Sequence, residues 1–219
     1  MPELPADMAK AKIVFFPNPG APSGVGYELS DVRRLLEAAP EAVVVIDEAY
    51  ADFDGNRRSA VPLLGEYPNL MVVRTFSKSY SLAGMRVGFG IGAPGLMAEL
   101  NKVRDYYNLD RLAQAAAVAA LRDQAHMRAN RDKLVATREW FARELAAVAD
   151  KVWPSAANFV FARFGRPRAA NLYRRLKENH VLVRYWDAPR IDDCLRISIG
   201  TDAQMRVALD KIKELLPTC

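Results

Sequence analysis

The sequence predicts an α/β protein, in which a partial, mostly parallel sheet is followed by a small α+β module. Three short apolar runs, at residues 12–16, 42–47 and 69–76, are rich in β-branched residues, as strands buried on both faces of a parallel sheet are. A helical pattern separates the first two runs, and the order strand, helix, strand indicates a βαβ unit. The last third of the chain alternates short strands with helices, which predicts the second module.

The first helix has a recognisable start and end. Ser30 is the expected N-cap, Asp31 favours the first turn, and Pro40 ends the pattern. Apolar residues spaced by three and four form its buried face: Val32, Leu35, Leu36 and Ala39.

Further elements follow in order along the chain. Residues 85–92 read as a strand, and "GLMAELNKV" opens a helix. Residues 109–149 are helical, with a core-packing stripe formed by Leu134, Phe141, Leu145 and Val148. Strands are expected at 157–164, 181–186 and 194–200, with helices near 168–179 and 203–216. The predicted parts are a partial large domain (1–108), a helical connector (109–150) and a small C-terminal domain (151–219).

Composition narrows the class of protein. With 51% hydrophobic and 26% charged residues, the chain predicts a globular protein with a sizeable core. No run approaches the roughly 18–20 apolar residues that span a bilayer. Two cysteines do not make a disulfide framework, so a reducing cytoplasm is expected. The net charge of +5 comes from basic residues interleaved with acids, so no nucleic-acid or membrane partner is expected.

Polar residues follow the predicted strands where a βαβ sheet gathers its ligands. Asn18, Asp47 and Lys78 each lie at or just past a carboxyl end, so they are expected to converge on one crevice. A free lysine is protonated at neutral pH, and it becomes chemically useful when its pKa is lowered or when a Schiff base holds it.

Pyridoxal phosphate enzymes need such a lysine, an acid that keeps the pyridine nitrogen protonated, and a phosphate site. Asp47 is the candidate acid, and Tyr50 could donate to the ring oxygen. Hydroxyls and a guanidinium suited to phosphate come from Thr75, Ser77 and Arg86. Each residue alone has an ordinary explanation: a solvated lysine, a capping acid or a surface arginine. Their order at strand ends favours the functional interpretation.

Four blocks carry a family resemblance: "NPGAPSG" (18–24), "VVVIDEAYADF" (43–53), "RTFSKSYSLAGMRVGF" (74–89) and "CLRISIGT" (194–201). They resemble fold-type I pyridoxal phosphate aminotransferases, and among these the histidinol-phosphate aminotransferase family. The resemblance implies that Lys78 forms the Schiff base, that Asp47 pairs with the ring nitrogen and that Tyr50 bonds the ring oxygen. The cofactor phosphate would be held by Thr75, Ser77 and Arg86. On the substrate side it implies Arg196 for the α-carboxylate, Arg184 for the substrate phosphate and Asn158 near the substrate.

The resemblance further implies transamination of histidinol phosphate with 2-oxoglutarate in histidine biosynthesis, by a homodimer. On the same scaffold, an aromatic amino-acid aminotransferase and a phosphothreonine-type decarboxylase are alternatives. Outside that class, the chain could be a cofactor-free binding or structural subunit, because family members carry a further N-terminal segment. Ala21 stands where the family commonly has the Asn that bonds the ring oxygen, and Asn18 could substitute for it.

Two other patterns in the sequence favour structural interpretations. "GIGAPG" (90–95) satisfies G-x-G-x-x-G with Asp110 downstream, but Pro94 removes an amide that a pyrophosphate would need. His126 and His180 are expected to be surface or capping residues. Because no Cys–His spacing suggests a ligand set, no metal is predicted.

Overall fold

The computed structural model describes residues 3–5 and 7–219, which divide into two compact units. The first unit includes residues 7–20 and 26–129, and the second comprises 21–25 and 130–219. Segment 21–25 joins the second unit through a hydrogen bond from the Ala156 amide to the Gly24 carbonyl (2.7 Å). The division predicted at 1–108, 109–150 and 151–219 stays a prediction.

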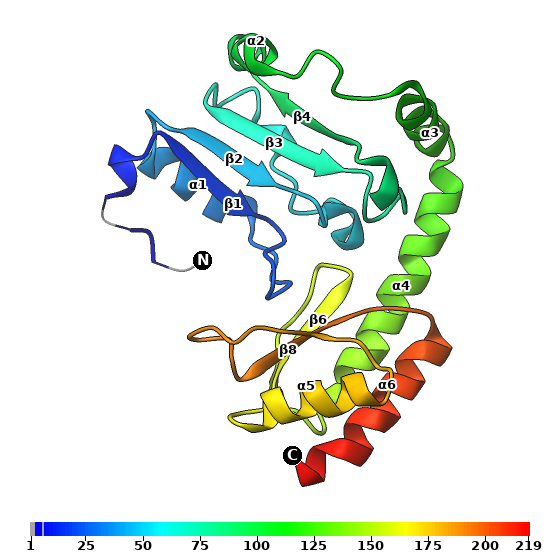
Figure 1. The fold of residues 1–219 in the computed structure, drawn as a ribbon. Helices are drawn as coiled ribbons and strands as arrows, with labels where there is room; N and C mark the ends of the chain where they lie inside the picture. Colours follow the sequence, from blue (N-terminus) through cyan, green and yellow to red (C-terminus); the bar gives the residue numbers. More distant parts are fainter. Residues whose placement is uncertain (1–2, 6) are drawn as a thin grey trace. The chain divides into compact units, whose positions relative to one another are not determined.

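The first unit is built on a four-stranded sheet with the order β1-β2-β3-β4 (Figure 1). Its strands are β1 (Ile13–Pro17), β2 (Val43–Asp47), β3 (Leu70–Thr75) and β4 (Gly88–Gly92). The first three strands are parallel and β4 is antiparallel to β3, which confirms the mostly parallel sheet. Asp47 pairs with Val73, and Thr75 pairs with Gly88. The carboxyl ends of β2 and β3 and the start of β4 therefore meet at one edge.

Helix α1 (Leu29–Ala38) covers one face of this sheet (Figure 1). Its apolar residues pack against β2, β3 and the 3₁₀ turn η3 (Val61–Leu63) in one core cluster. Strand alternation decides which β1 residues take part: Val14 and Phe16 pack on this cluster, whereas Ile13 and Phe15 are 56% and 73% exposed on the other face.

The start of α1 corrects one expectation. Its N-cap is Glu28, and Ser30 lies inside the first turn. Asp31 accepts a hydrogen bond from the Glu28 amide (3.3 Å), so the predicted first-turn acid caps the helix one residue before Leu29.

The 3₁₀ turns and helices that complete the first unit connect its strands. They are η1 (Met8–Lys10), η2 (Ala51–Asp54), η4 (Ala83–Met85), α2 (Pro94–Val103) and α3 (Arg111–Arg122). Asp110, the acid of the G-x-G-x-x-G motif, is the N-cap of α3 and accepts from the amides of Leu112 (2.8 Å) and Ala113 (2.9 Å). Its carboxylate therefore has a structural role. Helix α4 (Gln124–Leu145) follows, and its residues from 130 onward belong to the second unit.

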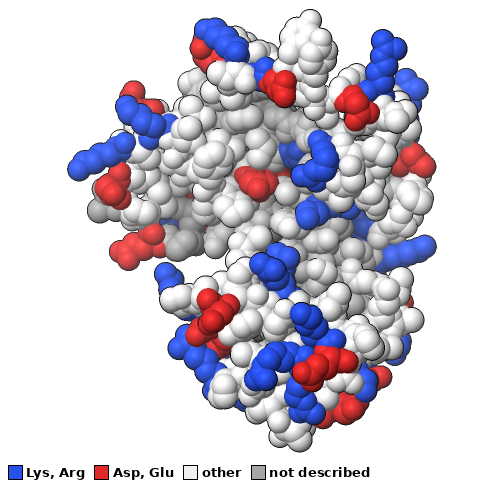
Figure 2. Space-filling model, viewed as in Figure 1, with Lys and Arg blue, Asp and Glu red and all other residues white. Residues whose placement is uncertain are grey.

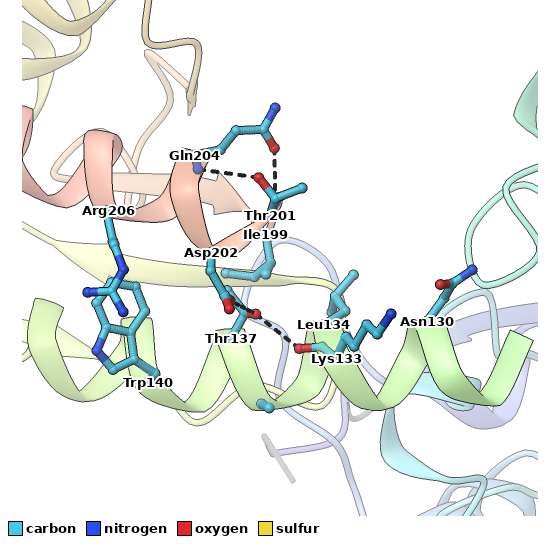
Figure 3. A pocket seen from close by; sticks show the side chains of 12 residues that line it. Asn130, Lys133, Leu134, Thr137, Trp140, Ile199, Thr201, Asp202, Gln204 and Arg206 are labelled. Atoms are coloured by element: carbon cyan, nitrogen blue, oxygen red, sulfur yellow. Dashed lines mark hydrogen bonds between the residues drawn. The ribbon is translucent and has the colours of Figure 1, made fainter. Parts of the chain in front are cut away.

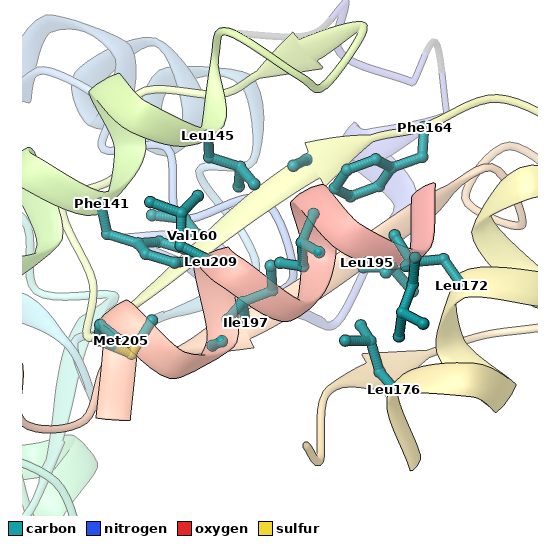
Figure 4. Close-up of a cluster of buried hydrophobic side chains, with 14 of the residues drawn as sticks. Phe141, Leu145, Val160, Phe164, Leu172, Leu176, Leu195, Ile197, Met205 and Leu209 are labelled. Carbon is teal, nitrogen blue, oxygen red and sulfur yellow. The ribbon is translucent and has the colours of Figure 1, made fainter. Parts of the chain in front are cut away.

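The second unit has an antiparallel sheet with the order β5-β6-β8-β7. Its elements are β5 (Lys151–Val152), β6 (Phe159–Arg163), α5 (Arg168–Glu178), β7 (Arg184–Tyr185), β8 (Cys194–Ser198), α6 (Asp202–Leu215) and η5 (Leu216–Thr218). Its core joins side chains of α4, α5 and α6 to the sheet (Figure 4). Phe141 and Leu145 are fully buried, and Leu134 and Val148 pack against this core, so the predicted stripe is core packing.

Strand β7 is shorter than the predicted 181–186, because residues 180–181 complete the end of α5. His180 adopts a left-handed φ of 60°, and its amide donates to the Lys177 carbonyl (3.1 Å). The Val181 amide donates to the Leu176 carbonyl (2.8 Å). This pair of bonds is a Schellman cap, with histidine in the position that glycine usually takes.

Charged side chains of both signs lie side by side over the face shown in Figure 2, as the interleaved sequence indicates. Within the described residues, no helix combines the length and the apolar character that crossing a bilayer requires.

Candidate active site

A hollow of about 480 Å³ lies in the first unit at the sheet edge where β2 and β3 end. Five of the predicted residues line it: Asp47, Thr75, Ser77, Lys78 and Arg86. The parallel pairing explains this convergence, because neighbouring parallel strands present their carboxyl ends at the same edge.

Asp47 is the last residue of β2, and its exposed side chain lines the hollow. Its Oδ1 accepts a hydrogen bond from the Ala49 amide (3.0 Å), which orients the carboxylate. Among the described residues no Lys, Arg or His pairs with it. The carboxylate can therefore accept a cationic or N–H partner.

Lys78 is exposed, and its Nζ lies 5.5 Å from the centre of the Tyr50 ring. This contact is a cation–π interaction, and it brings Tyr50 beside the hollow. No carboxylate in the described part of the chain forms an ion pair with Lys78. The amine is thus placed beside an aromatic ring and kept apart from acids that would neutralise it.

The loop around Lys78 is shaped by a hydroxyl and ends in an unusual backbone conformation. Thr75 Oγ1 accepts from the Ser77 amide (3.0 Å) and donates to the Val87 carbonyl (3.4 Å). Arg86 has a φ of 56°, a region that non-glycine residues rarely adopt. Its Nη1 donates to the Ala83 carbonyl (2.9 Å), and no acid in the described residues pairs with it. An exposed guanidinium with hydroxyls beside it is a donor set suited to an anion.

Asn18 is placed differently from the other predicted ligands. It is 1% exposed, and its Nδ2 donates to the carbonyls of Tyr27 (3.0 Å) and Arg58 (3.2 Å). Its Oδ1 accepts from the Tyr27 amide (2.9 Å). Both amide hydrogens are therefore used to hold backbone. Asn18 is not among the residues that line the hollow, and its cofactor-binding role stays a prediction.

The predicted substrate residues lie in the second unit. Arg184 and Arg196 are direct register partners on β7 and β8, and both guanidinium groups lie over the Trp186 ring, at 5.2 and 5.3 Å from its centre. Arg196 also lies 4.9 Å from the Phe159 ring centre. Its buried Nε has no hydrogen-bond partner in the described part of the chain. Two like charges opposite each other are unfavourable, so an anion between or beside them would be stabilised.

Asn158 precedes β6, and its carbonyl accepts a hydrogen bond from the Ile199 amide (2.9 Å). This bond extends the β6–β8 pairing by one step beyond the Phe159–Ser198 pair. Asn158 is half-buried, and its predicted place near the substrate stays a prediction.

A larger cavity, of about 730 Å³, lies between α4 and the start of α6 in the second unit (Figure 3). Thr137 donates a hydrogen bond to Asp202 there, and the Arg206 guanidinium lies 5.0 Å from the Trp140 ring centre. None of the predicted site residues lines this cavity. The smaller hollow beside β2 and β3 contains the predicted amine, carboxylate and phosphate-binding residues, and it is therefore the candidate active site.

Sequence reasoning missed Arg74, which lines this hollow, and three residues that are linked to it: Glu48, Asp52 and Ser79. Each is a sequence neighbour of a predicted residue or lies in the same loop. The one sequence feature that could have pointed to them is the alternation of side-chain direction, which places Glu48 on the opposite side from Asp47. In residues 3–5 and 7–219 no group of three or more His, Cys, Asp or Glu side chains could hold a metal ion.

The family model for aminotransferase class I and II matches residues 2–212. The chain belongs to this family. The histidinol-phosphate aminotransferase of Aromatoleum aromaticum is 45% identical over 216 residues, which are 97% of this chain and 60% of that protein. Histidinol-phosphate aminotransferase 2 of Burkholderia mallei is 48% identical over 209 residues, 94% of this chain and 58% of the relative.

Among solved structures, the histidinol-phosphate aminotransferase of Sinorhizobium meliloti in complex with pyridoxal-5'-phosphate superposes with a TM-score of 0.88. It is 30% identical, and the match covers 95% of this aminotransferase-family chain and 58% of that structure. These likenesses confirm the predicted fold class and the predicted family. The chain spans about 60% of the length of the curated relatives that it matches.

Proposed function

We propose that the protein is a pyridoxal phosphate-dependent aminotransferase that moves an amino group from histidinol phosphate to 2-oxoglutarate. The observation that carries the proposal is the convergence of Lys78 and Asp47, with Thr75, Ser77 and Arg86, on one hollow at the carboxyl edge of the sheet. The family assignment and the names of the relatives support the same reaction.

The residues present fit pyridoxal phosphate. Thr75, Ser77 and Arg86 supply hydroxyl and guanidinium donors for a phosphate dianion, and Arg86 has no competing acid among the described residues. Asp47 supplies an acceptor for a protonated pyridine nitrogen, oriented by the Ala49 amide. Lys78 supplies the primary amine, and Tyr50 lies beside it. When bound, the cofactor would serve as the electron sink that makes the substrate's α-proton acidic.

The chain's own residues would divide the remaining work. Lys78 would hold the cofactor covalently and, when its amine is released by substrate, take and return a proton at Nζ. Asp47 would keep the pyridine nitrogen protonated by accepting its N–H. Tyr50 would donate its hydroxyl to the ring oxygen, a role that matters more because Ala21 has no donor.

The substrate's anionic groups would be bound by the second unit. Arg184 and Arg196 are neighbouring guanidinium groups without acidic partners in the described residues, and their fork geometry suits carboxylate and phosphate. A substrate with two anionic ends, such as a phosphate ester of an amino alcohol and then a dicarboxylic 2-oxo acid, matches two such groups. By family we also propose a cytoplasmic homodimer, which native mass measurement would test.

The test is covalent trapping. The purified protein is mixed with pyridoxal phosphate, its visible Schiff-base band is recorded, and the complex is reduced with borohydride and digested. We expect the label on the peptide that contains Lys78. Lys78→Ala should abolish it, and Lys102→Ala, which removes an exposed lysine of α2 paired with Glu99, should leave it unchanged.

Reaction rates with three amino donors then distinguish the histidinol-phosphate aminotransferase from the aromatic aminotransferase and the decarboxylase. Histidinol phosphate should be preferred over phenylalanine, and threonine phosphate should release no carbon dioxide. Absence of the band and of the label in the wild-type protein would favour a cofactor-free subunit and refute the proposal.

A further inference from the structure

A partly buried charge network adjoins the candidate active site, and its Arg74 also lines the hollow. Glu48 follows Asp47 in the chain, and its side chain is 0% exposed. Its carboxylate accepts from Ser59 Oγ (2.9 Å) and from the Ala60 amide (2.6 Å). It also accepts from Arg74 Nε (3.0 Å) and Nη2 (2.6 Å). These four hydrogen bonds all come from residues of the first unit.

Arg74 extends the network toward the lysine loop. Its Nη1 lies 3.9 Å from Asp52 Oδ1, and Asp52 Oδ2 accepts a hydrogen bond from Ser79 Oγ. Ser79 is buried and is the next residue after Lys78. One guanidinium therefore bridges the segment after β2 to the segment after β3.

This arrangement sets Arg74 apart from Arg86, although both line the hollow. Arg86 donates to one carbonyl and has no acid beside it in the described chain, so it is available to a ligand. The Arg74 guanidinium is already shared by two carboxylates of the protein. Its Nε and Nη2 donate to Glu48 and Ser59, so these donors hold the protein's own segments and are not available to a bound phosphate.

A stabilising role alone is a weak explanation for such a pair. The cost of removing two charges from water offsets much of their attraction, and well-packed apolar side chains often do as well in the same place. The network does, however, fix two backbone segments relative to each other, one carrying Asp47 and the other Lys78. Their separation decides whether an amine and a carboxylate can contact the same ring.

We infer that Arg74, with Glu48, Asp52 and Ser79, forms a set of positioning residues that holds Lys78 at its working distance from Asp47. The inference rests on the proposed function and deepens it. Asp52 belongs to η2, which follows Tyr50, so the same set also holds the segment that carries the Tyr50 ring beside the amine.

The decisive variant is Ser79→Ala, which cuts the network at the lysine loop and leaves the buried Glu48–Arg74 pair intact. Ser81→Ala is the matched control: it lies in the same loop, is exposed, and its hydroxyl has no hydrogen bond in the described residues. Glu48→Gln/Arg74→Met is the second variant, because it removes both charges of the pair together and leaves neither buried alone.

The readouts are the dissociation constant for pyridoxal phosphate, the rate of borohydride labelling at Lys78 and the wavelength of the visible band. At metal sites, loss of a residue that orients a metal ligand costs roughly 10- to 100-fold, and by analogy we expect weaker pyridoxal phosphate binding in that range for Ser79→Ala and for the double variant. Ser81→Ala should match wild type. The thermal midpoint of the cofactor-free Ser79→Ala protein should stay close to that of wild type, which separates positioning from folding.

Three outcomes are distinguishable. Weaker binding and slower labelling in the two network variants, with a normal control, support the inference. Wild-type binding, labelling and spectrum in both network variants would overturn it while leaving the proposed function intact. Failure of wild type itself to be labelled at Lys78 would refute the proposed function, and the inference with it.

Discussion

The buried Glu48–Arg74 pair makes an asymmetric prediction about stability. Removing the cation by Arg74→Met leaves the Glu48 carboxylate, whose side chain is 0% exposed, with two donors in the described part of the chain, the Ser59 hydroxyl and the Ala60 amide. Removing the anion by Glu48→Gln leaves Arg74 with 19% of its side chain exposed and with Asp52 at 3.9 Å. The arginine therefore keeps a counter-charge and water, and the glutamate would keep neither.

The magnitudes follow from these environments. Breaking a buried pair so that one charge is left uncompensated costs about 3–5 kcal/mol, and Arg74→Met should fall in that range. In Glu48→Gln the amide oxygen still accepts from Arg74, but the NH2 group faces the Ala60 amide. One buried hydrogen bond and the charge-assisted part of the Arg74 bonds are lost, at about 1 kcal/mol each, for a total near 2 kcal/mol. Glu48→Gln/Arg74→Met should cost less than Arg74→Met alone, because no buried charge then stands unpaired.

Urea denaturation of the three variants measures this order. With a slope of about 2 kcal/mol/M, the expected shifts in midpoint are about 2 M for Arg74→Met and about 1 M for Glu48→Gln. The three tryptophans, Trp140, Trp153 and Trp186, all lie in the second unit, so their fluorescence reports that unit while far-UV circular dichroism reports both. A Glu48→Gln variant as unstable as Arg74→Met, or a double variant that costs the sum of the two, would refute the reasoning.

Three further predictions concern other parts of the chain. Burial raises the pKa of Cys194 to about 12. Iodoacetamide at pH 8 should therefore label Cys219 in the native protein and reach Cys194 only after denaturation, as peptide mapping would show. Equal labelling rates of the two cysteines would contradict this prediction. A hydrogen bond from Arg33 lowers the pKa of Glu66 below its ordinary 4.5, so the pair's contribution to stability is present above that pH and is lost as the pH falls through the lower folded value. The difference in thermal midpoint between wild type and Glu66→Gln should therefore shrink in acid, and a difference that grows would count against the pair. Leu195→Ala, at a site with 0% exposure in the second unit's core, should cost about 2–5 kcal/mol in a fluorescence-detected urea titration, and a cost below 1 kcal/mol would show that the core refills the space.

The sequence predicted the sheets well because burial on both faces leaves a direct mark on composition. The run at 42–47 contains Val44 and Ile46, both fully buried, and such a run has few alternatives to a central strand. The boundaries were less predictable, because they depend on caps. Glu28 and not the expected Ser30 is the N-cap of α1. A left-handed cap at His180 follows the end of α5 at Glu178, and the strand predicted at 181–186 begins only at Arg184.

The candidate site was predictable to the extent that its chemistry lies in single side chains at strand ends. Asp47, Thr75, Ser77, Lys78 and Arg86 could each be named from residue type and position. What the sequence could not supply was which neighbours these groups contact, because side-chain partners are set by the register of strands that are far apart in the chain.

Asn18 and Glu48 show the two ways in which that information matters. Asn18 has the right residue type and a strand-end position, but its amide is fully used by the backbone of Tyr27 and Arg58. Glu48 follows Asp47 and carries no sequence signal of its own, but its buried carboxylate accepts hydrogen bonds from Ser59 and Arg74. Both facts follow from tertiary contacts at separations of 9 residues or more.

The site is built from adjacent residues that divide two tasks. Strand alternation turns Asp47 toward the hollow and Glu48 into the interior, and the loop after β3 exposes Lys78 while burying Ser79. Each reactive residue is one peptide unit from a member of the network: Glu48, which Arg74 holds directly, or Ser79, which bonds to Asp52. A shift of the network therefore moves the reactive group with it. A substitution that never touches a ligand can therefore change the distance between the amine and the acid, and this is why the network variants should alter trapping at Lys78 before they alter the fold.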